Sequence, residues 1–187
     1  MQIFNRITPA LFAGLWLASA PLQAAPLKTD AAKSTVTAVF KQMGVPVEGK
    51  FKKFTANIDF DAAKPDSAKA QVEIDMSGFD LGAADFNAEV KKPEWFSSAK
   101  FPKASFVSSN IKAVNANQLT VSGKLTIKGK ALDVSFPLNL KKEGANQVFD
   151  GSLPIKRLAF NIGEGEWKDT GMVADEVIIK FHVSAAP

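Results

Sequence analysis

The stretch Leu119-Thr120-Val121-Ser122-Gly123-Lys124-Leu125-Thr126-Ile127 decides the fold of this chain. Apolar residues take every second position on either side of Gly123, and polar residues lie between them. Because successive side chains of a β-strand point to opposite faces of the sheet, this alternation predicts a strand with one apolar face. The next run, from Leu132 to Leu140, repeats the pattern. The sequence therefore predicts an antiparallel β protein.

Eight such runs occur after residue 35, and short segments rich in Gly, Pro, Asn, Asp and Lys separate them. They cover residues 36–40, 47–60, 68–76, 104–111, 119–127, 132–140, 149–155 and 177–183. The second run changes its apolar phase at Lys52-Lys53, which predicts a bulge or bend there. Eight antiparallel strands with one apolar face suit a closed barrel, because closure removes exposed sheet edges and leaves room for side chains or one slim ligand. Two packed sheets are the alternative.

One segment departs from the alternation. Residues 81–90 contain helix-forming residues, with two apolar residues four positions apart, and this predicts one short helix. Lys92-Pro93 ends it, because proline cannot continue a helix. Large aromatic side chains follow at Trp95-Phe96 and at Phe101-Pro102. We expect these side chains to plug or cover one end of the barrel.

Residues 1–24 have the features of a cleaved secretory signal peptide. One Arg precedes an apolar stretch that is too short for a spanning helix with its own stop-transfer flank, and small residues follow it. We expect cleavage after Ala24, which leaves residues 25–187 as one domain. A retained membrane anchor is the alternative, against which Pro21 argues. The chain has no cysteine, so it has no lipobox and no disulfide, and export without cysteine favours a bacterial periplasm.

The formal net charge of +4 comes from lysines spread along the chain. Such a balance mainly serves solubility and is compatible with weak attraction to anionic lipid surfaces. Nucleic-acid binding would need a dense basic patch with interleaved aromatic residues. We therefore predict no nucleic-acid partner.

The sequence offers few groups for catalysis. Its single histidine and its lack of cysteine argue against histidine-dependent triads, thiol catalysis and multi-histidine metal sites. No G-x-S-x-G, H-E-x-x-H, P-loop or EF-hand pattern occurs. We predict no catalytic site, no metal site, no covalent cofactor and no enzymatic activity.

Several polar features have a structural interpretation that we favour. His182 alternates with apolar neighbours, so we expect it on the outer face of its strand. Asp59 and Asp61 flank a turn, with a carboxylate pair for acid–base chemistry as the alternative. The acidic segment 163–169 is a candidate for a hard cation, but it lacks the oxygen spacing of a calcium loop. An outward stripe of four residues is expected on the solvated wall, with lipid-headgroup contact as the alternative: Lys124, Thr126, Lys128 and Lys130.

Several short motifs are spread along the chain. Each is a weak signal by itself, but together they identify a protein family. The motifs are Met43-Gly44-Val45, Glu48 to Phe54, Ile58 to Asp61, Trp95-Phe96, Lys100-Phe101-Pro102, Phe106, Val121 to Gly129, Ile155 to Gly163 and Val173 to Ile178. With them, nearly the whole chain after residue 24 resembles the YceI-like proteins. Many members carry histidines where this chain has Gln42 and Lys128, so no role of those histidines transfers. Residues 165–170 resemble the branch related to proteins fused with cytochrome b561 domains.

The resemblance implies a lipocalin-like, eight-stranded barrel that holds a polyisoprenoid lipid, of polyprenyl or isoprenoid quinone type, in an internal apolar pocket. The chain has 15 Phe, 3 Trp and no Tyr, and many Phe fall on the inward phase of successive strands. We expect eight inward residues to line a slot for the lipid: Phe40, Phe54, Phe60, Ile74, Phe106, Leu125, Phe136 and Phe181. The other interpretation is that these side chains simply fill the barrel.

These observations together lead us to expect a periplasmic carrier or reservoir for the isoprenoid lipid, present as a monomer or a homodimer. Transient contact with the membrane surface or with a membrane cytochrome is expected. Two other functions stay open. One is a ligand-free structural or interaction module of the envelope, with a solidly filled barrel. The other, ranked third, is an enzyme that acts on a bound isoprenoid.

Overall fold

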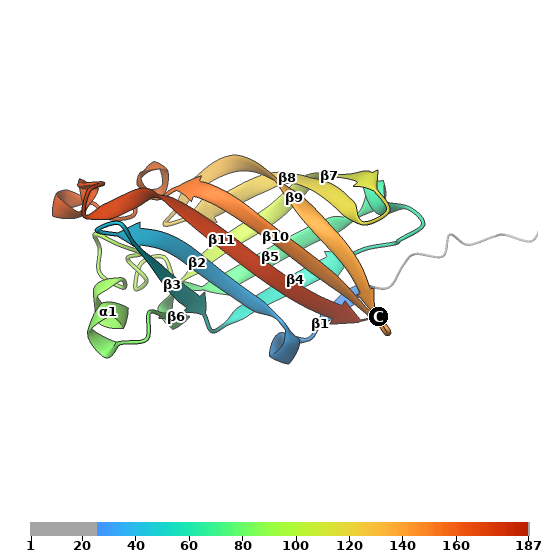
Figure 1. The fold of residues 1–187 in the computed structure, drawn as a ribbon, viewed down its shortest axis with the longest axis horizontal. Helices are drawn as coiled ribbons and strands as arrows, with labels where there is room; N and C mark the ends of the chain where they lie inside the picture. The colour runs from blue at the N-terminus through green and yellow to red at the C-terminus, as the bar shows by residue number, and fades with distance from the viewer. Residues whose placement is uncertain (1–25, 187) are drawn as a thin grey trace, which may run out of the picture.

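The computed structural model describes residues 26–186, which form one antiparallel sheet of eleven strands wrapped into a barrel (Figure 1). The strands are β1 (Leu27–Thr29), β2 (Thr35–Gln42), β3 (Val45–Phe51), β4 (Phe54–Asp59), β5 (Lys69–Asp75), β6 (Phe79–Asp80), β7 (Lys103–Asn115), β8 (Gln118–Ile127), β9 (Lys130–Glu143), β10 (Asn146–Lys156) and β11 (Val173–Ala186). Seven of the eight predicted runs each fall on one strand, and the run over residues 47–60 falls on two, β3 and β4.

Eight of these strands close into a ring in the order β1-β4-β5-β7-β8-β9-β10-β11. The short strand β1 completes the ring because it pairs with β4 on one side and with the end of β11 on the other. Leu27 lies opposite Ile58, and Lys28 lies opposite Ala186. The predicted all-β, eight-stranded antiparallel barrel is confirmed, and residues 26–186 form one continuous sheet instead of two packed sheets.

β1 pairs only with the last residues of β11, and β2 pairs with the earlier part of the same edge, from Val173 to His182. The strands β2, β3 and β6 continue the sheet from there. Here the sequence-based prediction is partly wrong, because residues 47–60 form two strands with different partners rather than one bent strand. β3 ends at Phe51 and pairs with β2 and β6, whereas β4 begins at Phe54 and pairs with β5 and β1. Between them, Lys52 N–H donates to Gly78 O over 3.2 Å and Lys53 O accepts from Asp75 N–H over 3.0 Å. The wall is therefore split at the two lysines.

The predicted short helix is confirmed as α1 (Ala84–Glu89). In addition, five 3-10 helices lie in the connections: Ala31–Lys33, Pro65–Ser67, Met76–Gly78, Arg157–Phe160 and Gly165–Lys168. The helix α1 and the segment before β11 lie at one end of the barrel, and the C-terminus lies at the other end (Figure 1). We call them the mouth and the closed end.

The predicted signal peptide, residues 1–24, lies outside the described residues, so its cleavage stays a prediction. Within residues 26–186, no helix combines the length and apolar character that a membrane span requires.

Candidate functional site

An internal cavity of about 610 Å³ lies at the mouth end of the barrel. Its walls are mainly the inward side chains of the strands, which alternate with solvent-facing residues as the sequence predicts. The strands contribute these apolar residues to the wall: Ala38, Phe40, Val47, Phe51, Ile74, Phe79, Ala104, Leu125, Ile127, Ile155, Val173, Val177 and Ile179. The predicted internal apolar pocket is therefore present.

The last strand shows how the interior changes along the barrel. Val177 and Ile179 point inward, line the cavity and are only partly buried, whereas Val183 and Ala185, further along the same face, are fully buried. Inward side chains that stay accessible face unfilled space. The mouth half of the barrel is thus hollow, and the half near the closed end is filled.

Loops from two parts of the chain form the mouth. Glu94 O accepts from Gly163 N–H over 2.8 Å and from Glu164 N–H over 2.9 Å, which joins the segment after α1 to the segment before β11. The rings of Trp95 and Trp167 meet beside this junction, with centroids 5.3 Å apart. Both line the cavity, together with a polar group of side chains: Gln42, Asp85, Glu89, Lys92 and Glu166. The mouth can therefore hold a polar headgroup beside an apolar interior.

The side chain of Arg157 holds in place the mouth loop, by which we mean residues 161–172 before β11. It is 2 % exposed, and its guanidinium donates to five backbone carbonyls at 2.6–3.1 Å, those of Ile162, Gly163, Trp167, Val173 and Ala174. Burial lowers the pKa of this guanidinium, and the charge of Asp175 acts in the opposite direction. The guanidinium carbon lies over the ring of Trp95, 5.7 Å from the ring centroid. Arg157 thus ties the mouth loop to the start of β11.

Lys128 corrects one sequence-based prediction. We expected it on a solvated outer stripe, but its side chain is only 7 % exposed. It lies in the turn between β8 and β9 with a positive φ of 49°, so the strand alternation no longer applies to it. Its Nζ donates to Asn161 O over 2.6 Å and to Glu164 Oε2 over 2.8 Å. It is therefore a second support of the mouth loop.

The eight candidate lining residues fall into three groups. Phe40, Ile74 and Leu125 line the cavity. Phe54 lies at the split in the wall, beside Ile74. The other four are packed against aromatic neighbours outside the cavity lining: Phe60, Phe106, Phe136 and Phe181. Contact of any of the eight with lipid stays a prediction.

The last group shows how the filled part of the interior is built. Phe136 lies between Phe106 and Phe181, with centroid distances of 5.5 and 5.4 Å, and these rings cross the barrel. Inward glycines make room for two of them. A Cβ on Gly123 would lie 2.6 Å from the ring of Phe106, and one on Gly151 would lie 2.3 Å from the ring of Phe181. The stack therefore separates the cavity from the closed end.

The sequence reasoning missed several residues of the mouth. Trp95 was expected to cover an end of the barrel, and it does line the cavity, as does Phe96. Phe101, in contrast, packs over Gly129 in the β8–β9 turn. Arg157 and Trp167 stand in the quoted motifs but received no role, because nothing in a local pattern shows which carbonyls an arginine will meet. The burial of the charged Arg157 side chain is the signal that would have identified its role, and burial is not visible in the sequence.

The other polar candidates have structural roles. His182 is on the outer face, as expected, and its Nδ1 lies 2.6 Å from Asp150 Oδ1. Asp61 accepts from Ala63 N–H in the turn after β4. Among residues 26–186, no three His, Asp or Glu side chains gather in a way that would hold a metal ion.

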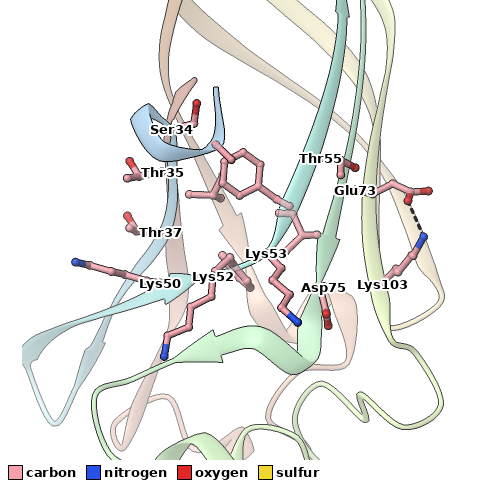
Figure 2. A pocket seen from close by; sticks show the side chains of 15 residues that line it. Ser34, Thr35, Thr37, Lys50, Lys52, Lys53, Thr55, Glu73, Asp75 and Lys103 are labelled. Atoms are coloured by element: carbon pink, nitrogen blue, oxygen red, sulfur yellow. Dashed lines mark hydrogen bonds and ion pairs between the residues drawn. The ribbon is translucent and has the colours of Figure 1, made fainter. Parts of the chain in front are cut away.

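A second hollow, of about 510 Å³, opens at the split between β3 and β4 (Figure 2). We call it the side cleft. Its floor is apolar, with Val36, Phe51, Phe54 and Ile74. Lysines, threonines and two carboxylates surround this floor, and Glu73 and Lys103 form an ion pair of 2.7 Å on its rim.

Comparison with known proteins agrees with this architecture. A UPF0312 protein from Shewanella oneidensis is 26% identical over 145 residues, which cover 76% of this chain and 74% of that protein. The crystal structure of Burkholderia cenocepacia BcnA superposes with a TM-score of 0.83 at 54% identity, and covers 85% of this chain and 100% of that one. A polyisoprenoid binding domain from Saccharophagus degradans shares the fold, with a TM-score of 0.69, 18% identity and coverage of 88% and 99%. The YceI-like domain model matches residues 27–185, and the chain therefore belongs to the YceI-like family.

Proposed function

We propose that this protein binds an isoprenoid lipid inside its barrel and carries it, or stores it, in the periplasm. The observation that carries the proposal is the cavity of about 610 Å³, with apolar walls and polar groups confined to its mouth. An isoprenoid has the matching form, because its long branched hydrocarbon tail ends in one polar headgroup. The polyisoprenoid binding domain that shares the fold supports the same ligand class.

The energetics of such a complex favour slow release. Burying about 800 Å² of hydrocarbon at about 25 cal/mol/Å² is worth about 20 kcal/mol before costs. Ordering of the tail and loss of free motion offset much of this. The remainder still supports a long-lived complex, since differences in affinity mostly appear in the dissociation rate. A carrier of this type would release its lipid at a membrane surface or to a membrane protein, such as a cytochrome that uses an isoprenoid quinone.

The first test is extraction of purified residues 25–187 with organic solvent, followed by mass spectrometry of the extract. We expect one isoprenoid, in near-equimolar amount, whose headgroup identifies the ligand class. An empty extract, together with no binding of added polyprenols or isoprenoid quinones, would contradict the proposal. It would favour the ligand-free interaction module instead.

A second test uses the tryptophans as reporters. Trp95 and Trp167 are the only tryptophans in residues 25–187, and both line the cavity. An isoprenoid quinone that enters the cavity should therefore quench tryptophan fluorescence in a saturable way. Trp167→Phe leaves one reporter inside the mouth, and Val107→Gln on the outer wall of β7 is the matched control that should leave binding unchanged. Linear quenching without saturation would indicate random collisions only.

A further inference from the structure

The side cleft and the cavity share two lining residues. Phe51 and Ile74 line both hollows, so these two side chains are the partition between them. Ile74 is fixed in the pairing of β5 with β4 and β7. Phe51 is the last residue of β3, only partly buried, and its ring rests against Phe79 with centroids 4.6 Å apart. The partition therefore depends on one aromatic side chain at a strand end.

The backbone leaves this place open. Over Thr35 to Thr37, β2 pairs with β11 and, in part, with β3, while β4 takes β1 and β5 as its neighbours. Thr35 and Thr37 stand on one side of the cleft, and Thr55 and Glu73 on the other (Figure 2). No ladder of backbone hydrogen bonds crosses between β2 and β4 in the described residues. A slim chain can thus leave the barrel sideways without breaking strand pairing.

The size of the cavity limits what it can enclose. A methylene group takes up about 30 Å³, as a water molecule does in the liquid, so the cavity holds about 20 such groups, or about four five-carbon isoprene units. The side cleft adds about 510 Å³, which nearly doubles the space. A tail of about eight units therefore needs both hollows.

We propose that the side cleft is the outlet for the tail of a long isoprenoid, which passes between Phe51 and Ile74 while its headgroup stays at the mouth. This inference rests on the proposed function. The apolar floor around Phe54 would receive the emerging tail. The lysines of the rim, Lys50, Lys52 and Lys53, can cover hydrocarbon with their methylene stems and keep their charges in water.

The absence of cysteine allows a direct test. Thr55→Cys places one thiol at an exposed position on the rim of the cleft, where a bulky, non-fluorescent maleimide would fill it. Thr120→Cys, on the outer face of β8 away from the cleft, is the matched control. Each variant is titrated with and without label. The ligands are isoprenoid benzoquinones that share one headgroup and have tails of about four or about nine units.

We expect the label on Thr55→Cys to weaken binding of the long quinone by about tenfold or more and to leave the short quinone unaffected. The label on Thr120→Cys should change neither. Equal binding of the long quinone with and without the label at Thr55→Cys would overturn the outlet. Loss of the short quinone as well would also overturn it, because the cleft would then be the main site. If the unlabelled protein binds neither quinone and its extract is empty, the proposed function itself fails.

Discussion

The closed end of the barrel, around Phe60 and Phe149, is filled, whereas the mouth end, around Phe40 and Ile179, is hollow. Both ends are built from strands with the same alternation of apolar and polar residues. At the closed end, Phe60 meets Phe149 edge-to-face with centroids 5.6 Å apart. At the mouth, the loops cover the opening and the inward side chains leave space between them. We therefore expect the closed end to supply most of the stability and the mouth end to supply the binding site.

The largest expected effect is at the closed end. Phe149 is 4 % exposed, so Phe149→Ala removes a ring from a filled interior and leaves a cavity. We expect a loss of about 3–5 kcal/mol in the free energy of unfolding, measured by urea denaturation, without a change in lipid affinity. Phe149→Leu is the control and should cost much less, since most of the volume remains. A loss below about 1 kcal/mol for Phe149→Ala would show that the closed end is not filled.

The next effect concerns Arg157 at the mouth. Arg157→Met keeps much of the side-chain volume but leaves five backbone carbonyls without their donor. We expect a loss of about 3 kcal/mol in unfolding free energy, because buried acceptors lose their partners. The mouth loop, residues 161–172, should also become a site of rapid proteolysis, and lipid affinity should fall. Arg157→Lys, with one nitrogen in place of three, should give an intermediate loss. Unchanged proteolysis would exclude the proposed role in the loop.

A matched pair of isoleucines compares the two ends with the same chemistry. Ile58 is 9 % exposed in the filled part, whereas Ile179 is partly exposed and lines the cavity. Ile58→Ala should cost about 3 kcal/mol, and Ile179→Ala about 1 kcal/mol, because truncation beside existing empty space removes fewer contacts. Lipid binding should show the reverse order, with weakening only for Ile179→Ala. Equal stability losses in the lipid-free protein would mean that both ends are equally filled.

The sequence predicts the barrel well because strand alternation is a local property. The inward phase of Leu125 and Ile74 is correct, and the two lysines at 52 and 53 are correctly marked as an irregularity. Pairing partners are not local, which is why one run was expected where β3 and β4 separate. The short strand β1 was missed, since three residues carry no alternation of their own.

The sequence cannot distinguish inward residues that line the cavity from inward residues that fill the barrel interior, and the candidate site shows the reason. Phe40 and Phe136 have the same residue type and the same strand phase, yet only Phe40 lines the cavity. The difference depends on which side chains of the other strands reach the same part of the interior. Phe136 meets Phe106 and Phe181, each of which has a glycine opposite its ring. Predicting such contacts between side chains on different strands requires knowing the pairing register of all the strands together.

The smallest expected effect is the pH response of the mouth. A hydrogen bond and the positive charge from Lys128 lower the pKa of Glu164 below its ordinary value. An acid with a lowered folded pKa stabilises the folded state above its unfolded pKa of about 4.3, and this contribution is lost as the pH falls through the lowered folded value. Glu164→Gln should therefore loosen the mouth loop at neutral pH, as seen by proteolysis of residues 161–172, and should make no difference in acid. Glu143→Gln, on an exposed carboxylate at the end of β9 near the closed end, is the control. A Glu164→Gln effect that persisted unchanged in acid would show that shape, rather than the charge facing Lys128, fixes the loop. The closed end, with its filled interior, should show no such response.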